Sequence, residues 1–133
     1  MDATPTRLVL PSQMRVVEVG MRDGLQSVRR TLPTTEKLRL VESLIDAGIK
    51  EIEVTSFAHP KVLPQMADAE RLLAGVPRDR GVRYRGLVPN AKGAERAVNS
   101  GVDEIVALTC TDVDVTMIDQ RRTHPQMWDE LDE

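Results

Sequence analysis

The sequence predicts an α/β fold built on a parallel sheet, and three observations support this prediction. Runs rich in β-branched residues alternate with runs in which apolar residues recur every three or four positions, in the order βαβαβαβ. A glycine follows each of the three expected crossover helices. Positions 47–54 and 100–107 also resemble each other, each reading as helix end, loop and strand. Strands joined by single helices lie parallel, with right-handed crossovers.

The first strand is expected over 15–19, where valines precede Gly20. A helix over 34–47 follows, because Thr34 and Thr35 can cap its start and Gly48 can end it. The same reasoning predicts strands over 49–55, 82–88 and 104–108, helices over 65–73 and 90–100, and a final short helix over 123–131.

Four strands fit either an open doubly wound sheet or part of a (β/α)8 barrel. A complete barrel takes about 250 residues, whereas this chain has 133. We therefore expect residues 1–14 to form a lead and the chain to be truncated. A small complete domain with a short last helix is the alternative.

Composition excludes several classes of function. The 18 basic and 21 acidic residues give a formal charge of −3, so no broad attraction to nucleic acid is expected. No apolar run approaches the roughly 20 residues needed to cross a bilayer, and the first residues lack a secretory pattern. The single cysteine, Cys110, cannot form an internal disulfide. We expect a cytoplasmic protein with no membrane partner.

Positions 18–26 hold the densest group of candidate functional residues. This loop follows the first strand, and ligands of parallel α/β folds gather at the carboxyl ends of strands. Asp23 offers a hard oxygen for a divalent cation. The neighbouring Arg22 can clamp a carboxylate or a developing oxyanion. The competing interpretation is a glycine-rich surface turn with an exposed ion pair.

Two further strand ends add candidates. Alternation places Glu51, Glu53 and Thr55 on one face of their strand. A buried Glu53 would need a partner, and Arg22 is the nearest cationic candidate, although a lysine on the surface would also serve. Asn90 follows the next strand, where it can either reach the same rim or cap a helix.

Other features are weaker. Four arginines form a basic stretch that either contacts phosphates or is simply solvated, at positions 78, 80, 83 and 85. Asp112 and Asp114 resemble only half of a calcium loop, so metal binding is not expected there. Cys110 fits a small buried residue better than a catalytic thiol.

Taken together, the motifs resemble the 3-hydroxy-3-methylglutaryl-CoA lyase family, which belongs to the metal-dependent lyase and synthase TIM barrels that carry an R-D motif at strand one. The opening VEVGMRDGLQ at positions 17–26 resembles the family's strand-one sequence. TSF at 55–57, PK at 60–61, VLPQMAD at 62–68 and LVPN at 87–90 add to the resemblance, which runs from about residue 16 to residue 108.

The resemblance implies that residues 15–133 form the N-terminal half of a TIM-barrel domain, a partial (β/α)8 barrel with about four βα units. It also implies divalent-metal-dependent retro-Claisen cleavage of an acyl-CoA thioester, 3-hydroxy-3-methylglutaryl-CoA, to acetyl-CoA and acetoacetate. Asp23 matches the family's first ligand to Mg²⁺ or Mn²⁺. Arg22 matches the arginine that stabilises the enolate oxygen, and Glu53 matches the acid that holds this arginine. The remaining matches are supporting positions around the substrate, at Gln26, Ser56 and Asn90.

The family completes its metal site with an H-x-H pair, a late asparagine and a cysteine-bearing loop, and none of them has a match here. We therefore expect the 133 residues alone to bind metal weakly and to turn over little or no substrate. Two unpaired edges would also favour association, so a homo-oligomer is expected. The alternatives are a related Claisen-condensing synthase or carboxyltransferase domain, or a non-catalytic fragment that acts as an oligomerisation module.

Overall fold

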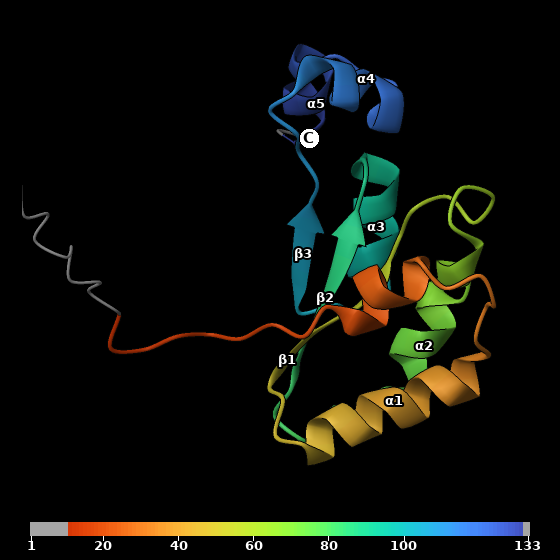
Figure 1. Cartoon of the computed structure of the whole chain (residues 1–133), viewed down its shortest axis with the longest axis vertical. Helices are drawn as coiled ribbons and strands as arrows, with labels where there is room; N and C mark the ends of the chain where they lie inside the picture. The colour runs from red at the N-terminus through yellow and green to blue at the C-terminus, as the bar shows by residue number, and fades with distance from the viewer. Residues whose placement is uncertain (1–10, 132–133) are drawn as a thin grey trace, which may run out of the picture.

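A three-stranded parallel sheet organises the protein, as the computed structural model shows (Figure 1). The structure describes residues 11–131, except for the side chains at 115, 118–120, 130 and 131. The strands β1 (Glu51–Ser56), β2 (Arg83–Val88) and β3 (Glu104–Ala107) lie side by side in chain order. The predicted α/β class with a parallel sheet is confirmed.

Three helices provide the crossovers. They are α1 (Thr34–Asp46), α2 (Ala69–Gly75) and α3 (Ala91–Asn99). Helix α2 packs on β1, α3 packs on β2, and α1 contacts α2. The positive φ angles of Gly48 and Gly101, 91° and 72°, explain why glycine ends two of the three helical segments.

The expected strand over 15–19 is wrong in its extent. Only Glu18 bridges to the sheet, where its backbone pairs with β1 on both sides of Ile52. A single turn of π-helix, η1 (Gly20–Gly24), follows almost at once. Because residues 15 and 16 are exposed and have no described strand on their far side, little burial stabilises a longer ladder there.

Two helical segments also differ from the expectation. The helix predicted over 65–73 is divided into a 3-10 turn, η2 (Pro64–Met66), and α2, because Pro64 supplies a favourable first position for a separate turn. Helix α4 (Val113–Gln120) was not predicted, whereas α5 (His124–Leu131) was. Both lie beyond the carboxyl end of β3 (Figure 1).

No helix within residues 11–131 is long and apolar enough to cross a membrane.

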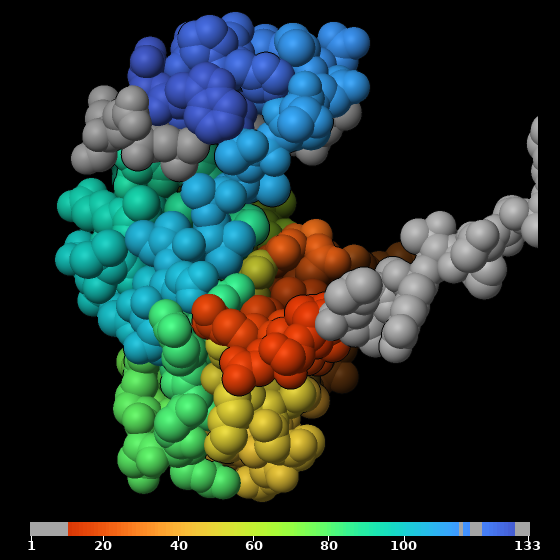
Figure 2. Space-filling model, turned by 90° about the vertical axis from the view of Figure 1, so that its left-hand side faces the viewer, coloured from red at the N-terminus to blue at the C-terminus, as the bar shows by residue number. Residues whose placement is uncertain are grey.

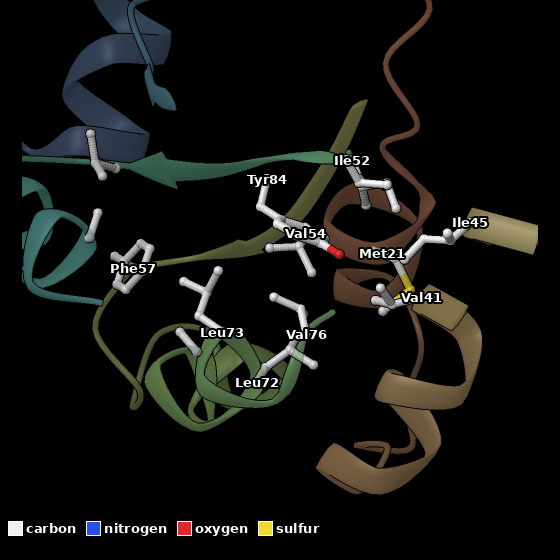
Figure 3. Packing of buried hydrophobic residues seen from close by; sticks show 14 residues of the cluster. Met21, Val41, Ile45, Ile52, Val54, Phe57, Leu72, Leu73, Val76 and Tyr84 are labelled. Carbon is white, nitrogen blue, oxygen red and sulfur yellow. The ribbon is translucent and has the colours of Figure 1, made fainter. Parts of the chain in front are cut away.

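The hydrophobic core lies between the sheet and the first two helices (Figure 3). Met21, Val41, Ile45 and Ile52 join η1, α1 and β1 in this cluster. Residues of β1, α2 and β2 continue it. The core thus fixes the start of the sheet and the segment immediately before it.

Gly86 allows an unusually close contact within the core. A Cβ atom at this position would lie 2.7 Å from Cε2 of the Phe57 ring. Phe57 is buried, and its backbone N–H donates to Leu87 O at 2.8 Å. A missing side chain on β2 therefore makes room for the ring that follows β1.

Candidate functional site

The predicted pairing of Arg22 with Glu53 is present. Arg22 Nε donates to Glu53 Oε1, joining η1 to the middle of β1. The side chains are only 17% and 7% exposed, and a carboxylate withdrawn from water to this extent needs a charge partner. The arginine is therefore held by a strand of the sheet and is not a free surface charge.

Asp23 lies beside this pair and faces solvent. Its Oδ1 accepts from Arg22 Nη1 at 2.8 Å and from Gln26 Nε2 at 3.0 Å. The side chain is 57% exposed. The loop thus brings together Arg22, Asp23 and Gln26, with Glu53 behind them. Charge-assisted hydrogen bonds of this kind fix the orientation of a carboxylate.

Ser56 and Asn90 reach the same strand-end rim but make no described bond to the Arg22 group. Ser56 is buried, and its Oγ accepts from Ala58 N at 3.2 Å. Asn90 Oδ1 accepts from Gly93 N at 2.8 Å, so the capping role is confirmed. This cap leaves the Asn90 amide NH₂ as a donor that a ligand could use.

A bulge changes the predicted faces of β1. The register to β2 shifts between Glu53 and Thr55, and Val54 enters the hydrophobic core. Thr55 Oγ1 contacts Met66 Sδ at 3.8 Å. The expectation that Thr55 shares the face of Glu51 and Glu53 is therefore wrong, because an extra residue in one strand ends the alternation.

A ladder of ion pairs covers the sheet next to the site. Arg85 Nη2 lies 2.7 Å from Glu51 Oε2 and 3.2 Å from Glu104 Oε2, which links all three strands. Arg15 donates to Glu51 at 2.7 Å, and this hydrogen bond is the main reason why the pKa of the Glu51 carboxyl is lowered. Arg83 also meets Glu104.

These pairs decide the open question about the basic stretch. Arg78 and Arg80 pair with Asp103 and Asp46, at 3.5 and 2.9 Å. All four arginines of the stretch thus have a carboxylate partner. Their charge is offset locally, and the stretch is not a ready phosphate site.

A separate apolar groove of about 750 Å³ lies between α3, β3 and α5. Its lining includes Asn90, Val98, Ile105, Leu108 and Met127. Arg22 and Asp23 are not part of it. Figure 2 shows a different hollow, between the α4–α5 region and the segment around η1.

Comparison with known proteins identifies the family. The model of the HMGL-like family matches residues 13–132. The chain belongs to the HMGL-like family. It is 46% identical to the mitochondrial hydroxymethylglutaryl-CoA lyase of Mus musculus over 103 residues, which are 77% of this chain and 32% of that protein.

Two further relatives support this assignment. The 3-hydroxy-3-isohexenylglutaryl-CoA/hydroxy-methylglutaryl-CoA lyase of Pseudomonas aeruginosa is 48% identical over 96 residues, covering 72% of this chain and 32% of that protein. An HMG-CoA lyase from Acenitobacter baumannii, solved with coenzyme A and 3-methylmalate, superposes with a TM-score of 0.84 at 34% identity. That superposition covers 88% of this chain and 38% of the solved one. The chain spans about a third of the length of the curated relatives it matches.

Sequence reasoning missed two residues that shape the site. Met21 is the buried residue of η1, and Glu18 Oε1 accepts from Gly20 N at 2.5 Å. An apolar residue between Gly20 and Arg22 is the signal that could have revealed Met21, since a purely exposed turn rarely carries one. Nothing in the sequence pattern marks Glu18 as a cap.

Proposed function

We propose that this chain carries the strand-one and strand-two part of a hydroxymethylglutaryl-CoA lyase site. In this proposal the whole protein cleaves 3-hydroxy-3-methylglutaryl-CoA to acetyl-CoA and acetoacetate. The observation that carries the proposal is the buried Arg22–Glu53 pair beside an exposed Asp23. The named lyases that the chain resembles support it.

Arg22 would act where charge develops. Cleavage leaves an enolate on the thioester, and a fixed positive charge near its oxygen lowers the barrier. Glu53 occupies Nε and Asp23 occupies Nη1, which leaves Nη2 for a substrate oxygen. Because Glu53 is nearly inaccessible to solvent, it holds the guanidinium in one orientation before substrate arrives. Gln26, Ser56 and Asn90 would contact substrate around this centre.

Mg²⁺ or Mn²⁺ would be held in part by Asp23. Its exposed carboxylate is a suitable hard ligand. Within the described part of the chain, however, no group of three His, Cys, Asp or Glu side chains could hold a metal ion. When bound, such an ion would polarise substrate oxygens and favour the alkoxide. The described residues can thus supply one metal ligand, Asp23, but not a complete metal centre. The isolated chain should therefore be nearly inactive.

We also propose that the sheet is part of a (β/α)8 barrel, with 15–133 as its first half. The buried Nε of Arg85 has no hydrogen-bond acceptor within the described residues, which supports a further segment on this face. Exposed Ile105 and Leu108 support association at the β3 end, including a homo-oligomer. Cytoplasmic location stays a prediction. No described feature favours the synthase or carboxyltransferase alternatives.

A chimera provides the test of function. Residues 13–132 would replace the matching segment of the Pseudomonas aeruginosa lyase, and acetoacetate release from 3-hydroxy-3-methylglutaryl-CoA would be measured with Mn²⁺. We expect turnover, and we expect Arg22→Gln to lower kcat by about 10²–10³-fold. The control, Arg80→Gln, removes an exposed arginine that pairs with Asp46 on the surface, and it should leave kcat unchanged.

Two results would contradict the proposal. A folded chimera without turnover would show that these residues do not supply a lyase site. Robust acetoacetate release by the isolated 133-residue chain would instead contradict the expectation that its metal centre is incomplete. A parallel assay with a longer branched glutaryl-CoA thioester would sharpen the substrate class, since one relative is named for such a substrate.

A further inference from the structure

The π-turn η1 has one buried side chain. Met21 is 3% exposed, whereas its neighbours Arg22 and Asp23 face the rim. Met21 belongs to the same cluster as Val41, Ile45 and Ile52, and Figure 3 shows its side chain directed into the space between them. The turn is thus attached to α1 and β1 by its apolar residue.

The backbone of the turn is closed at both ends. Gly20 N donates to Glu18 Oε1 at 2.5 Å, and Asp23 N donates to Val19 O at 2.7 Å. Leu25 N donates back to Arg22 O and Gly20 O. These hydrogen bonds fix the internal shape of the turn, and Met21 is its buried contact with the core.

We propose that Met21 is a positioning residue that sets Arg22 against Glu53. Its unbranched thioether fills the space between α1 and β1, and Arg22 is the next residue along the turn. Loss of this anchor would let η1 shift, and the bond from Arg22 Nε to Glu53 would open. The consequence for catalysis rests on the lyase function proposed above, whereas the geometry stands without it.

The test reads the arginine directly. In ¹⁵N-labelled 133-residue chain, Arg22 Nε–H should exchange slowly with water because it donates to a buried carboxylate. Arg22→Lys assigns the signal by removing it. In Met21→Ala we expect exchange at this group to be at least about tenfold faster. Met21→Leu, which keeps an apolar side chain of similar volume, should restore protection.

Val41→Ala is the matched control. It removes apolar volume from the same cluster but leaves η1 intact, so Arg22 Nε–H should remain protected. If Met21→Ala does not fold, Met21→Val shortens the side chain more mildly, and exchange at least about threefold faster than wild type is expected. Wild-type protection in the folded Ala or Val variant, or equal loss of protection in Val41→Ala, would overturn the inference.

The two proposals fail independently. Exchange at Arg22 is measured without substrate or metal, so an inactive chimera would remove the lyase assignment and leave the positioning result standing. Unchanged exchange in the Met21 variants, together with an active chimera, would remove only the role of Met21.

Discussion

The two ends of the sheet differ in packing although their sequences are alike. Around β1, Ile52 is 0% exposed and lies between a paired segment and β2. Around β3, the equivalent Ile105 is 36% exposed, and β2 is its only described strand neighbour. The predicted chemistry gathers at the first end. Similar sequences therefore give a fully buried strand only where neighbouring segments cover both sides of it.

The connections after the two strands show the same contrast. At the first end, Lys37 is buried and donates to Gln65 O and to Asp68, which ties α1 to the loop after β1. At the other end, Thr116 Oγ1 of α4 meets His124 Nε2 of α5 at 3.1 Å and donates to Cys110 O, in the segment before α4, at 3.2 Å. Arg122 Nη1 reaches Pro89 O at 3.3 Å as a link back to the sheet.

The largest expected effect comes from truncating the matched isoleucines. Ile52→Ala should lower the free energy of unfolding by about 2–5 kcal/mol, because it opens a cavity in the core. Ile105→Ala should change it by about 0.5 kcal/mol, since much of that side chain already meets solvent. Urea unfolding of both variants measures the difference. Equal losses would mean that the β3 end is as well covered as the β1 end.

A smaller and local effect is expected at Thr116. Its buried Oγ1 donates to Asp112 O at 2.7 Å, and it meets His124 Nε2 at 3.1 Å. Thr116→Val should weaken the α4–α5 region by about 1 kcal/mol.

Amide hydrogen exchange distinguishes the two ends in this variant. Amides of α4 and α5 should exchange roughly fivefold faster, while those of β1 stay unchanged. Thr111→Val, at an exposed position, is the control. Faster exchange in β1 as well would show that the two ends unfold together.

The prediction with the smallest effect on stability at neutral pH concerns Tyr84. Its buried side chain belongs to the hydrophobic core at the β1 end of the sheet. Burial raises the pKa of this phenol above its ordinary value of 10.0, and its hydroxyl donates to Pro77 O at 2.7 Å. The folded state therefore binds the proton more tightly than the unfolded state. The resulting stability is complete below pH 10 and is lost as the pH rises through the folded pKa.

The chain has one tyrosine, so ultraviolet absorbance of tyrosinate reports this group alone. The transition should occur above pH 10 and coincide with loss of stability. Tyr84→Phe should remove this part of the alkaline dependence. Ordinary titration near pH 10 in the folded protein would contradict the burial of the phenol.

Local sequence patterns predicted much of the fold, because the spacing of apolar residues and the glycines at helix ends mark most helices and strands. The helix over 34–47 and the strand ending at Val88 agree closely with α1 and β2. The strand over 15–19 failed because its extent depends on neighbours that local sequence does not describe. Helix α4 was missed, although Asp112 is a residue type that favours a helix start, and its Oδ1 accepts from Asp114 N there.

The candidate site was predictable where charge alone decides the partner. Glu53 needed a cation, and Arg22 was the nearest one, so their pairing followed from burial. The bulge at Val54 and the anchoring by Met21 depend on how β1, α1 and η1 fit together in space. Contacts of this kind leave no periodic pattern of residues, so the sequence alone could not predict them.

The close approach at Gly86 couples two distant positions. Any side chain there would collide with the Phe57 ring unless the ring became smaller or moved. Natural replacements at 86 and 57 should therefore change together, with added bulk at one position matched by reduced bulk at the other. The double variant Gly86→Ala, Phe57→Leu would test this coupling.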